Sequence, residues 1–385
     1  MEYFWEKSGW EQDDRHLSKI ESMPFKRNFP FIPEKKGLYI IRGPRQIGKS
    51  SWLKTVLKHY SKSEKCFYLS CENIDNNREL AEILASIRNR KVILLDEISF
   101  VKNWDRAIKH EVDLGKHHII MITGSHSYDL KRGSDLMPGR FESGGEFELL
   151  PMLFDEYYEV KLQAGWVNTD KLKDLEAYFR TGGFPDAVAE GGPEGKIPMR
   201  ALDTYWKWLV GDAIKLGKQK DYLEELMIQL SLKMQTANSL QGLAQKTSIG
   251  SHHTVKDYIT LLESSFAVKT LYAIDMNTNA YRYRKDKKFY FTDPLLYWLG
   301  LELSGRKYDV QQDATIAEMV AHEYLSRKNK RFGYVNGRGG EVDFILPGEW
   351  AIEVKWASDA RNLSKAYLNL SLLDKKVWLK SNFLE

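Results

Sequence analysis

Eight consecutive residues of the chain have the types and spacing of a phosphate-binding loop. They read Gly43-Pro44-Arg45-Gln46-Ile47-Gly48-Lys49-Ser50, which fits the pattern G-x-x-x-x-G-K-[ST]. The apolar run Leu38–Ile41 precedes the loop, and a stretch with helical character begins at Ser51. A loop between a buried strand and a helix N-terminus directs its backbone N–H groups at a phosphate. The sequence therefore predicts nucleotide contacts along Gly43–Ser51.

The residue types in this loop indicate separate roles. Gly43 and Gly48 let the backbone turn and approach the phosphates closely. Lys49 is expected to reach the β- and γ-phosphates, where its charge assists catalysis, and the Ser50 hydroxyl is expected to bind Mg²⁺.

A second apolar run, Val92–Leu95, ends in the two acids Asp96 and Glu97. An unbroken apolar run is typical of a parallel strand that is covered on both faces. Two acids at a strand end are common by themselves, but the phosphate loop upstream favours a functional interpretation. Asp96 is then expected to hold the Mg²⁺ shell. Glu97 is placed to orient and deprotonate the attacking water.

Two further residues are candidates for catalysis. The run His118–Thr123 predicts a third strand beside the other two, and it leads through Gly124 to Ser125. Ser125 is therefore expected near the γ-phosphate, as a sensor of its presence. Arg140 is a candidate for stabilising charge on the transferred phosphoryl group, from its own or a neighbouring subunit. The alternative is a surface arginine that follows a turn.

These motifs occur together, in order, over nearly the whole chain. The sequence resembles an AAA-like family of prokaryotic ATPases that carries a C-terminal domain of uncharacterised function. The strings that carry the resemblance are Arg42–Ser50, Leu94–Ile98, Ile122–Ser125, Pro138–Phe141 and Gly182–Pro185. The resemblance implies an ATPase core, a helical lid, a winged-helix module and a nuclease-like domain. It also implies ATP as the nucleotide, and no guanine-specific motif is recognisable in the sequence.

Strands and helices alternate in the first third of the chain. Strands are predicted at 38–42, 66–70, 92–96, 118–123 and 145–150, and helices at 50–60, 78–88 and 104–113. This alternation predicts an α/β fold with a parallel sheet and crossover helices. One or two helices are expected in the first 35 residues.

Length and composition set the remaining bounds. A chain of 385 residues is expected to hold two or three domains. Its 29% charged residues and the lack of a long apolar run predict a cytoplasmic protein without a membrane segment. Cys66 and Cys71 lack metal-ligand company and fit a reducing compartment. The net charge of +4 is too small to indicate nucleic acid by itself.

The predicted domains are an ATPase core at 1–150, a helical lid at 151–230, a winged-helix-like module at 231–300 and a nuclease-like domain at 301–385.

The third predicted domain contains the capping residues expected of a helix-turn-helix. Ser239 can cap a helix through Lys246, and Ser251 can cap a second helix through Ser264. Strands at 267–271 and 288–291 would form the wing. Between them, Tyr281–Lys285 interleaves aromatic and basic residues, which suits DNA or RNA. The alternative is a packing or protein-interaction module.

The last domain carries a second candidate site. Strict alternation along strands at 341–346 and 351–356 places Glu341, Asp343 and Ile345 on one face with Ala351, Glu353 and Lys355. The pattern resembles the D…E-x-K signature of restriction-endonuclease-like nucleases, with Glu318 as the helical acid and a helix at 362–372 after the strands. The resemblance implies that Glu318, Asp343 and Glu353 hold a divalent cation and that Lys355 is catalytic. The alternative is an ordinary hairpin with one solvated face.

Three functions remain open from the sequence. The first is an ATP-hydrolysing, Mg²⁺-dependent machine that acts on nucleic acid. The second is an ATP-gated, metal-dependent nuclease, and the third is a nucleotide-dependent switch that binds a protein partner. The residues do not predict the oligomeric state.

Overall fold

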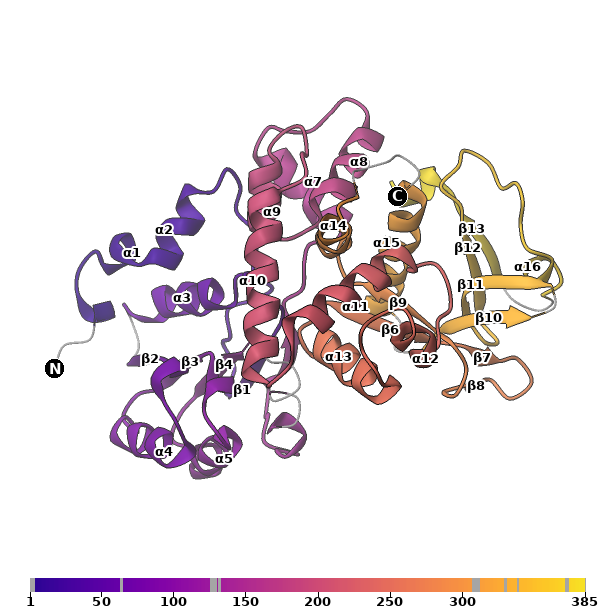
Figure 1. Ribbon diagram of the computed structural model, residues 1–385. Helices are drawn as coiled ribbons and strands as arrows, with labels where there is room; N and C mark the ends of the chain where they lie inside the picture. Colours follow the sequence, from indigo (N-terminus) through magenta and orange to yellow (C-terminus); the bar gives the residue numbers. More distant parts are fainter. Residues whose placement is uncertain are drawn as a thin grey trace. The chain divides into compact units, whose positions relative to one another are not determined.

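The computed structural model describes residues 4–62, 65–124, 130, 133–306, 312–328, 331–337, 339–370 and 374–384. The chain forms two compact units, Met1–Leu150 and Pro151–Glu385 (Figure 1). Within the described ranges no helix is long and apolar enough to span a bilayer. The finer division of the second unit into lid, winged helix and nuclease-like domain stays a prediction.

A five-stranded parallel sheet forms the centre of the first unit. Its order is β2-β3-β4-β1-β5, and each neighbouring pair is parallel. The strands are β1 (Gly37–Arg42), β2 (Cys66–Ser70), β3 (Val92–Asp96), β4 (Ile119–Gly124) and β5 (Gly145–Glu148). The predicted α/β fold with a parallel sheet is confirmed. The third predicted strand, β4, separates β1 from β3.

Helices cover both faces of this sheet. Figure 1 shows α3 on one face and α4 and α5 on the other. The helices are α1 (Trp10–Asp13), α2 (Arg15–Ser22), α3 (Lys49–Tyr60), α4 (Asn77–Ser86) and α5 (Trp104–Leu114), with short 3-10 turns η1 (Phe4–Glu6), η2 (Cys71–Asn73) and η3 (Ile98–Phe100). In this unit, each predicted strand or helix end lies within two residues of the observed end. The apolar strand residues are buried because both faces are covered.

The second unit begins with a helical stretch. Its helices are α7 (Phe154–Gln163), α8 (Lys171–Thr181), α9 (Pro185–Gly191), α10 (Met199–Lys215) and α11 (Lys220–Leu232). The Gly182–Pro185 string joins α8 to α9. A Cβ at Gly183 would lie 2.0 Å from the Met152 carbonyl oxygen, so only glycine fits there.

The elements expected for a winged helix follow in the predicted order. They are α12 (Leu240–Ala244), α13 (His252–Ser264), β6 (Val268–Tyr272), β7 (Ile274–Asp275), β8 (Ala280–Tyr281) and β9 (Lys287–Phe291). Strands β6 and β9 are antiparallel, as are β7 and β8. Ser239 and Ser251 cap α12 and α13 by accepting hydrogen bonds from backbone N–H groups. The assignment of this group as a winged-helix module stays a prediction.

The chain ends in a four-stranded sheet with the order β10-β11-β12-β13. Its elements are α14 (Pro294–Leu303), α15 (Gln312–Lys328), β10 (Gly333–Gly337), β11 (Gly340–Leu346), β12 (Trp350–Val354), α16 (Lys365–Leu368), β13 (Asp374–Trp378) and η4 (Lys380–Phe383). The helix predicted at 362–372 is shorter: within the described residues it spans only Lys365–Leu368.

The predicted strict alternation along β11 is wrong. Val342 and Ile345, three positions apart, lie in one buried cluster with Ala351 and Tyr367. The register of β10 against β11 shifts along this stretch, and such an irregularity places two successive side chains against one partner. Ile345 and Ala351 therefore belong to the core and not to a polar face.

A buried histidine in this unit carries a pH prediction. His322 of α15 stacks on Tyr290, with ring centroids 4.4 Å apart, and its Nδ1 atom has no hydrogen-bond partner within the described residues. Burial, helped by the charge of Lys269, lowers the pKa of His322 from 6.5 to about 3. Below pH 6.5, His322 is therefore protonated in the unfolded chain but stays neutral in the folded chain.

The free energy of unfolding should therefore decrease as the pH falls from 6.5 toward 3. We expect His322→Phe to remove roughly 3 kcal/mol of acid destabilisation between pH 6.5 and about pH 4. Urea unfolding at both pH values measures this difference in stability. The proteins compared are the wild type, His322→Phe and the exposed control His59→Phe. An equal acid sensitivity in His322→Phe and the wild type would contradict a neutral buried imidazole.

Candidate active site

The phosphate loop leaves the carboxyl end of β1 and enters α3. The Lys49 side chain lies along the loop, with Nζ donating to the carbonyl oxygens of Gly43 at 2.9 Å and Pro44 at 2.8 Å. Only 4% of Lys49 is exposed. The ammonium is thus held inside the turn where the loop would surround a phosphate.

The two loop glycines are needed for different reasons. A Cβ at Gly43 would lie 2.1 Å from the carbonyl oxygen of Leu149, so a close backbone approach demands glycine. Gly48 has a φ of 103°, in the region that favours glycine. Phe29 flanks this second glycine, 3.6 Å from the position of a Cβ there.

The other loop residues take positions that suit a rigid anion cradle. Ile47 is 1% exposed and anchors the loop in the core. Ser50 and Ser51 stand in the first turn of α3, where backbone N–H groups lack partners within the helix. The remaining predicted contacts, Pro44, Arg45 and Gln46, lie on the loop between the glycines.

Asp96 ends β3 in a buried position that two side chains orient. The Thr123 hydroxyl donates to Asp96 Oδ1, and the Tyr68 hydroxyl donates to Oδ2 at 3.1 Å. Burial, followed by the charge of Asp96, raises the pKa of Tyr68 and keeps it a donor. Hydrogen bonds of this kind fix a carboxylate for metal binding.

Sequence reasoning missed Thr123 and Tyr68. A signal for Thr123 was present, because this polar residue directly follows the apolar run Ile119–Ile122. Tyr68 gave no such signal, because its contact with Asp96 depends on the pairing of β2 with β3.

Glu97 follows Asp96 in a strained backbone conformation. Its φ of 52° is uncommon for a residue other than glycine and costs about 1 to 3 kcal/mol. The Glu97 N–H donates to Thr123 Oγ1 at 3.2 Å. This contact holds the backbone turn after β3, and Glu97 is half-buried.

The phosphate loop and the acidic pair share one edge of the sheet. Strand β4 lies between β1 and β3 in a parallel arrangement, so all three carboxyl ends meet at the same edge. Two strand spacings separate the loop from Asp96 by roughly 10 Å. That span suits a triphosphate and one metal ion. Ser50 and Asp96 offer the oxygen ligands that Mg²⁺ prefers.

The amino-terminal helices are anchored next to this site. Lys54 of α3 pairs with Asp14 at 3.0 Å, and both side chains are almost fully buried. The Lys54 ammonium also lies 3.7 Å from the ring centroid of Tyr68. Burial raises the pKa of the neighbouring Cys71 thiol to about 12, which leaves it neutral.

The in-cis role predicted for Arg140 is wrong. Phe141 accepts a hydrogen bond from the Leu38 N–H at the amino end of β1, so Arg140 lies at the opposite edge of the sheet from the loop. Its guanidinium forms two bonds to Asp113, at 2.8 and 3.1 Å. A role toward a neighbouring subunit stays a prediction. Ser125 lies outside the described residues.

The residues of the second candidate site fall into two groups. Glu318 and Asp343 lie with Glu341 around Lys288. Glu353 instead contacts Lys355, at 3.3 Å, and accepts from Ser364. No set of three or more His, Cys, Asp or Glu side chains among the described residues could hold a metal ion.

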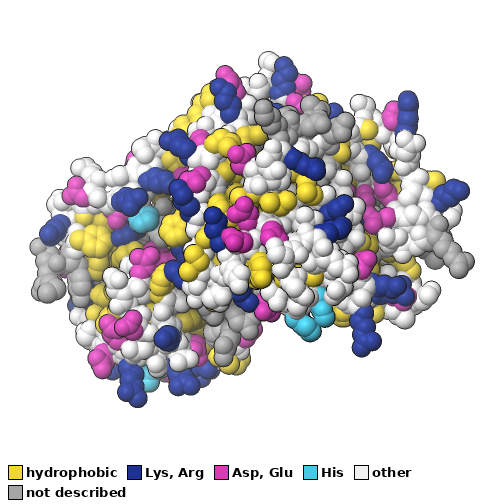
Figure 2. All heavy atoms as spheres, in the orientation of Figure 1, with side chains coloured by type: hydrophobic (Ala, Val, Ile, Leu, Met, Phe, Trp, Pro, Cys, Tyr) yellow, Lys and Arg dark blue, Asp and Glu magenta, His cyan; other side chains and the backbone are white. Residues whose placement is uncertain are grey.

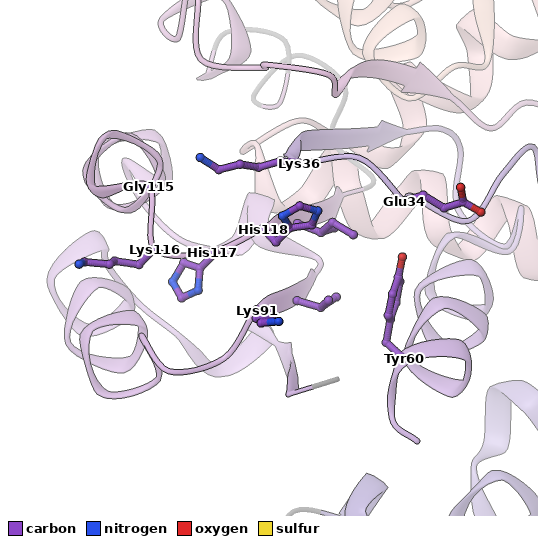
Figure 3. Close-up of a pocket in the computed structure, with 10 residues that line it drawn as sticks. Glu34, Lys36, Tyr60, Lys91, Gly115, Lys116, His117 and His118 are labelled. Atoms are coloured by element: carbon purple, nitrogen blue, oxygen red, sulfur yellow. The ribbon is translucent and has the colours of Figure 1, made fainter. Parts of the chain in front are cut away.

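A separate cavity of about 600 Å³ lies at the amino ends of β1, β3 and β4. It is therefore distinct from the phosphate loop. Lys36, Lys91 and Lys116 line it, but Figure 3 shows their ends spread apart. Lys36 also pairs with Glu142 at 3.1 Å. The basic groups do not converge on one ligand position.

Comparison with known proteins agrees with this geometry. Residues 35–158 match the family model of an AAA domain, and residues 172–306 match that of a domain of unknown function.

Relatives occur in archaea and bacteria. The uncharacterized protein MJ1544 of Methanocaldococcus jannaschii is 26% identical over 83% of this chain and 73% of its own. An uncharacterized protein of Haemophilus influenzae is 24% identical over 80% of this chain and 78% of its own. Among solved structures, the Walker-type ATPase PABY2304 of Pyrococcus abyssi has a TM-score of 0.47 at 15% identity, and the match covers 76% of this chain and 95% of that one.

Four observations lead to one conclusion: the loop at β1, the acids at β3, the five-stranded parallel sheet and the matching family model. The first unit is an AAA-like P-loop domain, and a domain family of unknown function follows it in the chain.

Proposed function

We propose that the chain is a Mg²⁺-dependent ATPase that acts on nucleic acid through the winged-helix-like group of its second unit. The observation that supports hydrolysis is the shared sheet edge of the phosphate loop, Asp96 and Glu97. A loop alone would support binding, whereas an acid beside the metal position supports attack by water.

Each residue of the loop and the acidic pair has a defined task. Lys49 exchanges its bonds to the Gly43 and Pro44 carbonyls for phosphate oxygens. Ser50 and Asp96 would hold Mg²⁺, which would supply positive charge to neutralise the phosphates. Glu97 accepts the proton of the attacking water.

An exposed basic surface supports the nucleic-acid part of the proposal. His252, His253 and Lys256 are exposed at the start of α13. Figure 2 shows histidine side chains and groups of basic side chains near one another over α13 and the β7–β8 hairpin. Basic groups on one face attract a phosphate backbone and release its counterions on binding.

Three tyrosines next to these charges offer a stacking platform. The rings of Tyr272, Tyr281 and Tyr283 lie edge to face or tilted, with centroids 5.2 to 5.8 Å apart. Tyr281 is anchored by donating to the Phe332 carbonyl, whereas Tyr283 is 64% exposed. Exposed Arg284 follows directly. An exposed ring on a supported cluster suits an unpaired base.

The test is ATP turnover with and without single-stranded, duplex and branched DNA and RNA, together with binding over a salt series. We expect nucleic acid to stimulate turnover and binding to weaken steeply with salt. Normal basal turnover with neither effect would remove nucleic acid from the proposal and favour a switch that binds a protein.

Tyr283→Ala should weaken the binding of single-stranded nucleic acid. Loss of one stacked base costs about 1 to 3 kcal/mol, which is about a 5- to 150-fold rise in Kd. Because the side chain is exposed, Tm should stay unchanged. The matched control is Trp208→Ala, an exposed aromatic on α10, which should bind normally. Fluorescence anisotropy with a labelled oligonucleotide measures both, and equal affinity for Tyr283→Ala and wild type would contradict stacking.

A further inference from the structure

A lysine ammonium lies inside the carboxylate group that the nuclease resemblance predicts to hold a metal ion. Lys288 Nζ is 3.1 Å from Glu318 Oε1 and 3.9 Å from Asp343 Oδ1, and it also pairs with Glu341. The Lys288 side chain is completely buried. It comes from β9, whereas the acids come from α15 and β11.

Three of the four carboxylate oxygens of Glu318 and Asp343 already accept hydrogen bonds. Glu318 Oε1 accepts from the Tyr290 hydroxyl, and Oε2 accepts from Gln235 Nε2 at 3.0 Å. Asp343 Oδ2 accepts from the Val354 N–H at 2.9 Å. The fourth oxygen, Asp343 Oδ1, faces the Lys288 ammonium at 3.9 Å.

The third predicted ligand, Glu353, lies near enough for its charge to act on Asp343, but its own hydrogen bond and ion pair are with other residues. Glu353 accepts from the Ser364 hydroxyl at 3.0 Å and pairs with Lys355. This division agrees with the lack of a metal-competent set among the described residues. The donor set therefore does not fit the divalent cation of a D…E-x-K nuclease.

Three carboxylates, those of Glu318, Glu341 and Asp343, surround the buried Lys288 ammonium. A divalent ion held by Glu318 and Asp343 would be repelled by this ammonium in a poorly screened interior. Occupation by the ammonium and by a metal ion exclude each other.

We propose that Lys288 is the resident cation of this carboxylate cluster, so that the cluster binds no divalent metal and cleaves no phosphodiester. Its role is an ionic joint that ties β9 to α15 and β11. The proposal concerns the second unit alone and does not depend on ATP hydrolysis in the first.

The first test compares the wild type with Asp343→Asn without nucleotide. Mn²⁺ titration followed by electron paramagnetic resonance should give the same number of bound ions for both proteins. Incubation with DNA and Mn²⁺ should give no cleavage that the substitution removes. A Mn²⁺ ion or a cleavage activity that is present in the wild type and lost in Asp343→Asn would overturn the proposal.

The second test removes the ammonium. Lys288→Met should gain a Mn²⁺ ion bound at least about tenfold more tightly than any such ion in the wild type, with a rise in Tm on adding Mn²⁺. Adding Asp343→Asn to this variant should abolish both gains. The matched control Lys355→Met, which removes the 31% exposed lysine beside Glu353, should gain neither.

An unpaired buried carboxylate can prevent folding. If Lys288→Met is insoluble, Lys288→Met combined with Glu341→Gln removes one negative charge and keeps Glu318 and Asp343. A folded variant of either kind that gains no Mn²⁺, or an equal gain in Lys355→Met, would refute the resident-cation assignment.

Discussion

Glu97→Gln should bind ATP as the wild type does and lose turnover by about 10² to 10⁴. The amide keeps the size and the hydrogen-bonding reach of the side chain but cannot accept a proton from water. The left-handed turn at this position and its bond to Thr123 are made by the backbone, so the substitution leaves them in place. Phosphate release gives kcat, and calorimetry with Mg²⁺ and ATP gives Kd.

The exposed acid Glu82 on α4 provides the matched control. Glu82→Gln should change neither quantity, since it alters charge on the same unit far from the carboxyl edge of the sheet. Normal turnover by Glu97→Gln would remove Glu97 from its role as base. A loss of ATP binding along with turnover would assign it to the metal site instead.

The features predicted well from the sequence are those with local causes. The phosphate loop is a continuous string whose glycines meet steric demands within the loop or from the next strand, as at Gly43 and Leu149. The central strands β1, β3 and β4 are largely apolar runs, so their ends follow from composition. Asp96 and Glu97 could be placed because parallel strands present their carboxyl ends together.

The features that escaped prediction depend on which distant segments meet. Tyr68 reaches Asp96 only because β2 pairs with β3. Arg140 sits beside a turn in the sequence, yet the chain returns it to the amino edge of the sheet, where Asp113 of α5 binds it. A local sequence pattern determines neither the order of strands in a sheet nor the path of a loop.

The C-terminal unit shows the same limit in another form. Period-two alternation predicts faces correctly only for a regular strand, and the irregularity in β11 places Ile345 in the core with Val342. Lys288 stands more than 50 positions before Asp343 in an unrelated strand, so a motif read from the acids alone could not include it. A complete set of motif residues therefore indicates a fold more strongly than it indicates a metal site.

Lys49→Ala should impair ATP binding as well as turnover, unlike Glu97→Gln, because in the proposed site the Lys49 ammonium contacts phosphate from the moment ATP binds. The ammonium is held by the Gly43 and Pro44 carbonyls, so its loss also frees two acceptors inside the loop.

We expect ATP affinity to fall at least about tenfold and kcat to fall by about 10² to 10³, because a preorganised charge is lost from a water-poor site. The matched control is Lys58→Ala, an exposed lysine in the last turn of the same helix, which should bind and turn over ATP normally. Calorimetry and phosphate release measure the two quantities. Wild-type affinity in Lys49→Ala would mean that the loop does not hold the phosphates. A loss of turnover with intact affinity would mean that Lys49 contacts phosphate only in the transition state. Loss of both affinity and turnover, which the buried ammonium at the start of α3 predicts, would mean that it contacts phosphate in the ground state as well.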